Sequence, residues 1–288
     1  MKLTTIFFFL LTQSFWLLAQ NTPLEFEASI PKIEPQTQLY KVTPQDSLYA
    51  DIYYPKDFKE GEKRPAIVFF FGGGWVGGNR DHFQRQGRYL ADKGMIAITV
   101  DYRIRSVHET SPIEAMEDAR SAMRWVKANA DELGVDLDKL AAGGGSAGGH
   151  LAAVTATLNQ FDAETDDTSI SCKPKLLVLF NPVIDTTPKG YGAEKLGKNQ
   201  KKASPVHHVK KGIPPTLIFH GTEDTTVPFE NVQRFERLMK KKGNTCELLA
   251  YERQKHGFFN FRKGTEEYFE KTVKAMEAFL VKHGYLNQ

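Results

Sequence analysis

Several short stretches of the chain are almost entirely apolar, and apolar and polar residues do not alternate within them. Five of them are long enough to form a strand: residues 66–71, 95–100, 176–180, 217–219 and 247–251. Continuous apolar runs are what strands covered on both faces require. Two further strand-like segments, 38–42 and 47–54, precede the first run. This pattern predicts a sheet whose central strands are buried between two layers.

Between the apolar runs, apolar residues recur every three or four positions, which is typical of one face of a helix. Three such faces are Ala115, Ala119, Ala122 and Val126; Val232, Phe235, Leu238 and Met239; and Phe269, Val273, Met276 and Leu280. Alternation of strands with helices predicts an α/β fold, with a mostly parallel central sheet and helices on both faces. Functional groups in such folds collect at the carboxyl ends of the strands.

The first 20 residues differ from the rest of the chain. A positive charge at Lys2 precedes two apolar runs, 6–11 and 15–19, which end at the small residue Ala19. This is typical of a secretory signal peptide, and the polar residues 12–14 make it too short to span a bilayer comfortably. We therefore expect a signal peptide over 1–20, a secreted or periplasmic protein and no stable membrane insertion. An uncleaved membrane anchor is the alternative.

Residues 21–288 are expected to form one domain with a short cap-like insertion at 185–214. That stretch has no clear period, and a loop of this length is usually functional or disordered. It holds seven lysines against a single glutamate, Glu194. The segment is interpreted either as a small cap that faces an anionic substrate or as a solvated loop.

Composition excludes some classes of protein. Apolar residues make up 41% and charged residues 25% of the 288 residues, which is the balance of a globular domain. The formal net charge of +3 is too small to indicate nucleic-acid binding. The two cysteines, Cys172 and Cys246, are expected to lie about two strand spacings apart, roughly 9–10 Å. A disulfide needs a shorter separation, so two free, buried thiols are expected.

The strongest chemical signal is the run from Gly143 to Gly149, which contains Gly-x-Ser-x-Gly around Ser146. A serine on a very sharp turn from strand to helix needs glycines two residues away on either side, because strand and helix approach closely there. A short apolar strand, 140–142, precedes the turn, and a helical pattern follows it. Ser146 is therefore the predicted nucleophile, with the amino end of the following helix directed at it.

A serine hydroxyl needs a base to accept its proton, and the base needs a carboxylate. In this fold the acid and then the histidine follow the serine along the chain. His256 is the predicted base because it lies in a loop after the strand that ends at residue 251. Asp224 is the predicted acid, with Glu223 as its competitor. His220 ends a predicted strand and is interpreted as a packing and hydrogen-bonding residue.

The oxyanion of the tetrahedral intermediate needs hydrogen-bond donors. One is expected to be the backbone N–H of Ala147, directly after the nucleophile. The glycine run that follows the strand 66–71 offers the second, from Gly73 or Gly74.

These motifs together resemble the α/β-hydrolase superfamily. Within it, the chain is similar to the hormone-sensitive-lipase-like and bacterial feruloyl- and acetyl-esterase-like branch. The resemblance runs from Ile67 to Phe258. It rests on the stretches 71–75, 101–103, 144–150, 214–216 and 256–258, together with His220-Gly221, Asp224 and Val227-Pro228. The family usually has a histidine before the three glycines, whereas this chain has Phe71. The resemblance also assigns a structural, hydrogen-bonded role to Asp101, Tyr102, Arg103 and Asp118.

The resemblance implies a serine esterase that removes acetyl, feruloyl or other short acyl groups from carbohydrates without a cofactor or metal. Its substrate would be a small-molecule or polysaccharide ester. Fold alone does not fix the substrate, so two alternatives stay open. One is a serine peptidase of the prolyl-oligopeptidase type, and the other is a non-catalytic carbohydrate-binding relative. The sequence leaves the oligomeric state open.

Overall fold

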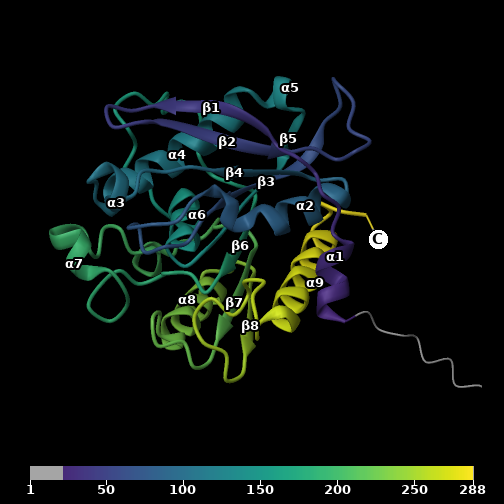
Figure 1. Cartoon of the computed structure of the whole chain (residues 1–288). Coiled ribbons are helices and arrows are strands. Elements are labelled where there is room, and N and C mark those ends of the chain that lie inside the picture. The colour runs from purple at the N-terminus through teal and green to yellow at the C-terminus, as the bar shows by residue number, and fades with distance from the viewer. Residues whose placement is uncertain (1–21, 288) are drawn as a thin grey trace, which may run out of the picture.

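The computed structural model describes residues 22–287, which form one eight-stranded sheet flanked by helices (Figure 1). The strand order is β1-β2-β4-β3-β5-β6-β7-β8. β1 and β2 pair antiparallel, β2 pairs antiparallel with β4, and the remaining pairs are parallel. The strands are β1 (Gln36–Val42), β2 (Ser47–Tyr53), β3 (Arg64–Phe70), β4 (Ile96–Val100), β5 (Val135–Gly145), β6 (Leu176–Phe180), β7 (Thr216–Gly221) and β8 (Cys246–Tyr251).

The helices cover both faces of this sheet. One face packs against α1 (Pro23–Ser29), α2 (Gln84–Asp92) and α9 (Glu266–Lys282), and α1 and α9 lie side by side (Figure 1). The other face packs against α4 (Pro112–Ala128), α6 (Ala147–Thr157) and α8 (Phe229–Lys241). Shorter helices are α3 (Arg105–His108), α5 (Ala130–Leu133) and α7 (Ala193–Leu196). The predicted mostly parallel α/β sheet is confirmed.

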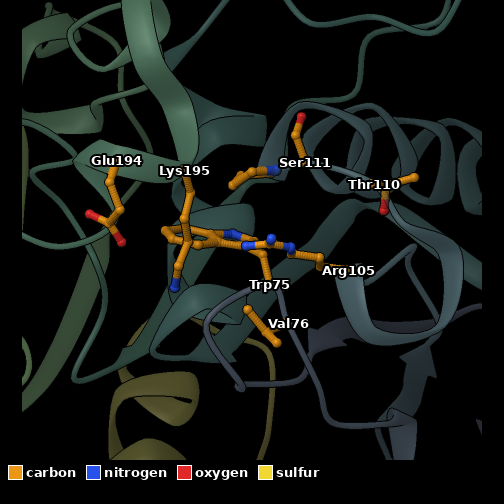
Figure 2. Close-up of a pocket in the computed structure, with 8 residues that line it drawn as sticks. Trp75, Val76, Arg105, Thr110, Ser111, Glu194 and Lys195 are labelled. Carbon is orange, nitrogen blue, oxygen red and sulfur yellow. The ribbon is translucent and has the colours of Figure 1, made fainter.

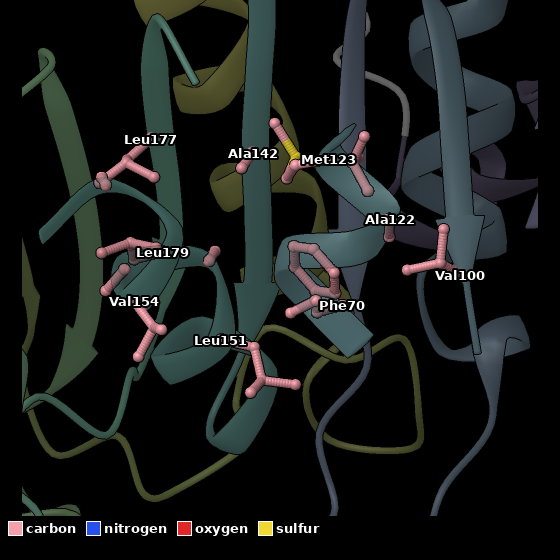
Figure 3. Packing of buried hydrophobic residues seen from close by; sticks show 14 of the residues in the cluster. Phe70, Val100, Ala122, Met123, Ala142, Leu151, Val154, Leu177 and Leu179 are labelled. Carbon is pink, nitrogen blue, oxygen red and sulfur yellow. The ribbon is translucent and has the colours of Figure 1, made fainter. Parts of the chain in front are cut away.

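The pleat of the strands separates the core into two layers. In β3, Val68 and Phe70 face α4 and α6, whereas Ile67 and Phe69 face α2 and α9. Figure 3 shows the first layer, in which Leu151 and Val154 of α6 lie over strand residues that include Phe70. A central strand must be apolar on both sides to supply both layers, which explains its unbroken apolar run.

The strand before the elbow is longer than the apolar run suggested. The sequence indicated only 140–142, but β5 extends over Val135–Gly145. Its last three residues are glycines, which have low intrinsic strand preference. They are nevertheless held in the ladder because β5 pairs with β3 on one side and β6 on the other.

A buried ionic cluster lies beside the end of β4. The guanidinium group of Arg103 donates two hydrogen bonds to the fully buried carboxylate of Asp118, at 2.8 and 2.9 Å. Lys41 from β1 adds a third contact to Asp118, at 2.7 Å. Asp101 forms a separate pair with Arg80, at 2.7 Å. These contacts tie the antiparallel edge of the sheet to the loops after β4.

Residues 185–214 pack on the rest of the domain through several short helical turns, namely α7, Gly197–Asn199 and Pro205–His208. His150 of α6 donates a hydrogen bond from Nε2 to the carbonyl of Ala203, at 2.8 Å. Burial lowers the pKa of His150 to about 4, so this ring is neutral at physiological pH. Asp185, itself buried, pairs with Arg234 of α8 at 3.1 Å.

Several remaining expectations concern absences or the first residues. Both cysteines are free and buried, as predicted. Within residues 22–287, no helix has the length and apolar character needed to cross a bilayer. The same residues contain no group of three or more His, Cys, Asp or Glu side chains suited to a metal ion. The predicted signal peptide, 1–20, lies outside the described residues.

Candidate active site

Ser146 stands at the turn from β5 into α6 in a backbone conformation that side chains rarely adopt, with φ 55° and ψ −117°. The glycines two residues away explain how the turn closes. A Cβ on Gly148 would lie 2.0 Å from the carbonyl oxygen of Phe70, and one on Gly144 would lie 2.5 Å from that of Gly148. The turn is fixed further by the Ser146 N–H, which donates to the Phe180 carbonyl at 2.9 Å.

The structure brings Ser146, His256 and Asp224 into one hydrogen-bonded chain. Nε2 of His256 lies 2.9 Å from Oγ of Ser146, and Nδ1 lies 2.7 Å from Oδ2 of Asp224. The three residues follow β5, β8 and β7, so all lie at the carboxyl edge of the parallel sheet. Asp224 accepts a hydrogen bond from Nδ1–H of His256, which leaves Nε2 free to accept the proton of the serine hydroxyl.

The carboxylate of Asp224 is shielded from solvent but fully hydrogen-bonded. Burial alone would raise the pKa of Asp224. The hydrogen bonds from His256 and from the backbone N–H of Val227 outweigh this effect, so the pKa is lowered. Its second oxygen, Oδ1, accepts the N–H groups of Thr226 and Val227 at 2.9 Å each. Asp224 is therefore ionised at neutral pH. The competitor Glu223 is exposed.

His220 lies beneath this pair. Its ring is fully buried, and Nε2 donates to the carbonyl of Val227 at 2.9 Å. The same nitrogen lies 3.3 Å from Asp224. The structure thus places His220 as a support of the Asp224 loop, with no hydrogen bond to Ser146.

The glycine loop after β3 passes beside the nucleophile. A Cβ built on Gly72 would lie 3.5 Å from the Cβ of Ser146. Among the described residues, the N–H groups of Gly73 and Gly74 have no hydrogen-bond acceptor. Ala147 begins α6, where the first N–H groups of a helix lack intrahelical partners. Three unpaired backbone donors are therefore available near Ser146. The N–H of Ala147 directly follows the serine in sequence, and the N–H groups of Gly73 and Gly74 belong to the loop that passes beside it.

Side chains hold the two ends of this glycine loop. Gly72 donates its N–H to Nδ1 of His82 at 2.9 Å. At the other end, Nζ of Lys195 donates to the Gly74 carbonyl at 3.2 Å and to the Tyr191 hydroxyl at 3.0 Å. His82 and Lys195 were not predicted as site residues from the sequence, because neither lies in a recognisable motif.

Phe71 occupies the position where the family usually has a histidine. Its ring stacks on Tyr102, with centroids 3.9 Å apart, and its carbonyl accepts the Tyr102 hydroxyl at 2.8 Å. The residue therefore anchors the start of the glycine loop through packing and its backbone.

Ser146 and His256 open into a pocket of about 280 Å³. The pocket is also lined by Gly72–Gly74, His82, Asn181, Tyr191, Thr226, Gly257, Phe259, Asn260 and Arg262. Asn181 accepts the Gly257 N–H at 2.9 Å, while its own Nδ2 is buried without a partner among the described residues. This pocket is large enough for a small acyl group.

A second pocket of about 210 Å³ is lined by Trp75 and Val76, which directly follow the glycine loop (Figure 2). Lys195 from α7 and Arg105 from α3 both line it, beside Trp75. Two buried polar atoms in its wall, Nε1 of Trp75 and Oγ1 of Thr110, have no partner within residues 22–287. Glu194 is the carboxylate in the lining.

Comparison with known proteins identifies the family. Residues 50–239 match the BD-FAE family, which is more than half of the chain. The chain belongs to the BD-FAE family. This membership places it in the α/β-hydrolase superfamily, as its motifs indicated. The matched range contains Ser146 and Asp224 but ends before His256.

Several relatives are named esterases. The chain is 29% identical over 239 residues to Esterase LipC of Mycobacterium tuberculosis, covering 72% of this chain and 56% of LipC. It thus spans about half the length of the curated relatives it matches.

Among solved structures, Thermogutta terrifontis esterase 2 phosphoramylated by tabun is 44% identical. The TM-score is 0.85, and the match covers 90% of this chain and 98% of that one. The same esterase with propionate bound is 43% identical, with a TM-score of 0.85 and coverage of 90% and 97%.

Proposed function

We propose that this BD-FAE protein is a serine carboxylesterase that hydrolyses short-chain esters through an acyl-enzyme. The hydrogen-bonded chain from Ser146 through His256 to Asp224 carries this proposal. It supplies a nucleophile, a base with an available nitrogen and a carboxylate that stabilises the protonated base.

In the proposed reaction, Oγ of Ser146 attacks the ester carbonyl carbon while Nε2 of His256 takes the hydroxyl proton. Negative charge develops on the carbonyl oxygen, where the N–H groups of Ala147 and of Gly73 or Gly74 stabilise it. The imidazolium of His256 then protonates the departing alcohol. A water molecule, activated by the same nitrogen, releases the acid and restores the serine.

Two solved structures support the class of reaction and the size of the acyl group. The tabun adduct is of an esterase, and organophosphates react with an activated nucleophile. The propionate complex shows that the related esterase binds a short carboxylic acid. A pocket of about 280 Å³ beside Ser146 is compatible with an acyl group of this size.

Hydrolysis of aryl acetate, propionate and butyrate by the purified protein tests the proposal. Turnover should be lost in Ser146→Ala, and paraoxon should add its phosphoryl mass to the wild type but not to this variant. Unchanged turnover in Ser146→Ala would refute the assignment. Faster cleavage of a dipeptide amide than of the acetyl ester would favour the peptidase alternative.

We further propose that the natural substrate is an acylated carbohydrate carrying negative charge, such as an acetylated sugar acid with a free carboxylate. Supporting this, Arg105 lines the second pocket and forms no ion pair within residues 22–287. The buried donor Nε1 of Trp75 lies in the same wall. A carboxylate is the ligand that a guanidinium and an indole N–H would bind together.

Arg105→Gln tests this substrate class. The ion pair would be partly exposed, so we expect KM for an acetylated uronide to rise about two- to fivefold. KM for the matching neutral acetylated sugar should stay unchanged. Arg237→Gln on the exposed side of α8 is the control. High salt should remove the preference for the charged substrate. Equal effects on both substrates would refute it.

The amino-terminal pattern supports export, and we propose that the mature protein acts outside the cytoplasm. Amino-terminal sequencing of the protein from cell fractions tests this. A mature chain beginning near residue 20 or 21 in the extracytoplasmic fraction is expected. An uncleaved, cytoplasmic chain would contradict it.

A further inference from the structure

The glycine loop beside Ser146 is connected to the His256 loop by a second hydrogen-bonded chain, separate from the triad. The Gly72 N–H donates to Nδ1 of His82 at 2.9 Å, and Nε2 of His82 lies 2.6 Å from Oδ1 of Asn260. Asn260 in turn donates from Nδ2 to the carbonyl of Gly257 at 3.0 Å. Gly257 directly follows His256.

The partners in this chain define the protonation of His82. A backbone N–H can only donate, so Nδ1 must be the unprotonated, accepting nitrogen. The Gly257 carbonyl can only accept, which orients the Asn260 amide so that its oxygen faces His82. Nε2 must therefore carry the proton. His82 is neutral, and one tautomer alone satisfies both neighbours.

The surroundings favour the neutral form. Burial lowers the pKa of His82, and the nearby charge of Arg262 lowers it further, while the hydrogen bond to Asn260 opposes them. The ring packs against the aromatic rings of Phe83 and Phe259, with centroids 4.9 and 5.8 Å away. The triad residue His256 lines the same pocket but is not bonded to His82.

We propose that His82 is a positioning residue that aims the oxyanion donors of the glycine loop by accepting the Gly72 N–H, and that the imidazole can do so only in its neutral, Nε2-protonated form. The inference rests on the proposed esterase function. Gly72 directly precedes Gly73. An acceptor that holds the Gly72 N–H therefore fixes the orientation of the peptide groups of Gly73 and Gly74. Protonation of His82 would put a donor against the Gly72 N–H and displace the loop.

Two substitutions of similar size separate the two contacts of His82. In His82→Asn, Oδ1 takes the place of Nδ1 and still accepts the Gly72 N–H, but the contact with Asn260 is lost. In His82→Gln, the terminal amide takes the place of Nε2, so the Gly72 contact is lost instead. We expect the Asn variant to keep most of the wild-type kcat.

The Gln variant should lose about 10- to 100-fold in kcat with little change in KM. A misplaced oxyanion donor weakens stabilisation of the transition state and leaves binding of the substrate unchanged. His208→Asn, outside the active-site pocket, is the control for loss of an imidazole. Thermal unfolding shows whether each variant is folded. Equal losses in the Asn and Gln variants, or none in the Gln variant, would overturn the proposal.

Asn260→Asp tests the protonation state. A carboxylate beside Nε2 raises the pKa of His82, so kcat should fall on the acid side at a higher pH than in the wild type. The new charge also reaches His256, so the double variant His82→Asn/Asn260→Asp is needed. In that double variant, the additional loss of kcat at low pH that Asn260→Asp causes should disappear. If that loss persists, His82 is not its source and the proposal fails.

The tautomer can be measured without any esterase assay. Nitrogen-15 NMR of the imidazoles in the intact protein should show His82 neutral near pH 7, with its proton on Nε2. A proton on Nδ1 would overturn the inference. A wild type that shows the expected tautomer but hydrolyses no ester would instead refute the proposed function.

Discussion

Asp224 and His256 are joined by a hydrogen bond of 2.7 Å between Oδ2 and Nδ1. The other carboxylate oxygen of Asp224 accepts two backbone N–H groups at the same time. Asp224→Asn should leave the backbone contacts in place but present an amide N–H to Nδ1 of His256. The imidazole would then adopt the wrong tautomer for accepting the proton of Ser146. We expect kcat on aryl acetates to fall about 10⁴-fold.

Steady-state kinetics with a folding check measure this effect. Glu223→Gln is the matched control, because that side chain is exposed and does not contact the imidazole. It should keep wild-type turnover. A comparable loss in both variants would contradict the assignment of Asp224 as the acid.

The lowered pKa of Asp224 also predicts a pH dependence of stability. An aspartate whose pKa is lower in the folded than in the unfolded state stabilises the fold above its unfolded pKa of about 3.9. That contribution is lost as the pH falls through the folded pKa. The difference in free energy of unfolding between wild type and Asp224→Asn should therefore shrink below about pH 4, measured by urea denaturation. A difference that stayed constant with pH would contradict it.

The contact of Gly148 with β3 leaves no room for a side chain. Gly148→Ala would bring a Cβ within 2.0 Å of the Phe70 carbonyl oxygen, so either β3 or the elbow must move. We expect a loss of about 1–3 kcal/mol of stability, as for other overpacked sites, together with loss of turnover. Gly77→Ala has open space around its Cβ and serves as the control. Wild-type stability and rate in Gly148→Ala would refute the tight elbow.

The buried cluster around Asp118 predicts a large stability effect away from the site. Asp118→Ala leaves Arg103 and Lys41 without their carboxylate, and breaking a buried pair in this way typically costs about 3–5 kcal/mol. Urea denaturation measures it. Asp131→Ala removes an ion pair with Lys63 at the surface and should change stability little. Equal effects would argue against the cluster as a structural tie.

Lys195 is predicted to affect the chemical step. Its ammonium group donates to the Gly74 carbonyl and to Tyr191, so Lys195→Met frees one end of the glycine loop. We expect kcat to fall about tenfold with a neutral aryl ester, since small displacements near the reacting atoms are costly. The exposed Lys198→Met is the control. A loss seen only with charged substrates would instead indicate a binding role.

Much of this architecture was predictable because its signals are local. The unbroken apolar runs gave the buried strands, and the glycines around Ser146 predicted the elbow, since its close approach depends on neighbours in sequence. Asp224 and His256 could be chosen because the carboxyl ends of parallel strands meet at one edge. In each case a short stretch of chain contains the physical requirement.

The supporting contacts could not be predicted in the same way. His82 accepts a backbone N–H from one loop and reaches Asn260 in another, far along the chain. Neither residue belongs to a periodic pattern. Lys195 was one of seven lysines in residues 185–214, and only its position on the folded domain distinguishes it from the others. Such roles arise from tertiary packing, which pairs residues without a fixed spacing.

The contact between Lys195 and Gly74 has a consequence for how this enzyme class can diversify. The segment 185–214 both borders the two pockets described above and holds the glycine loop in place. Exchanging this segment for that of another esterase would therefore alter turnover together with substrate choice. New specificity would require compensating changes in the glycine loop, so the two stretches are expected to evolve as one unit.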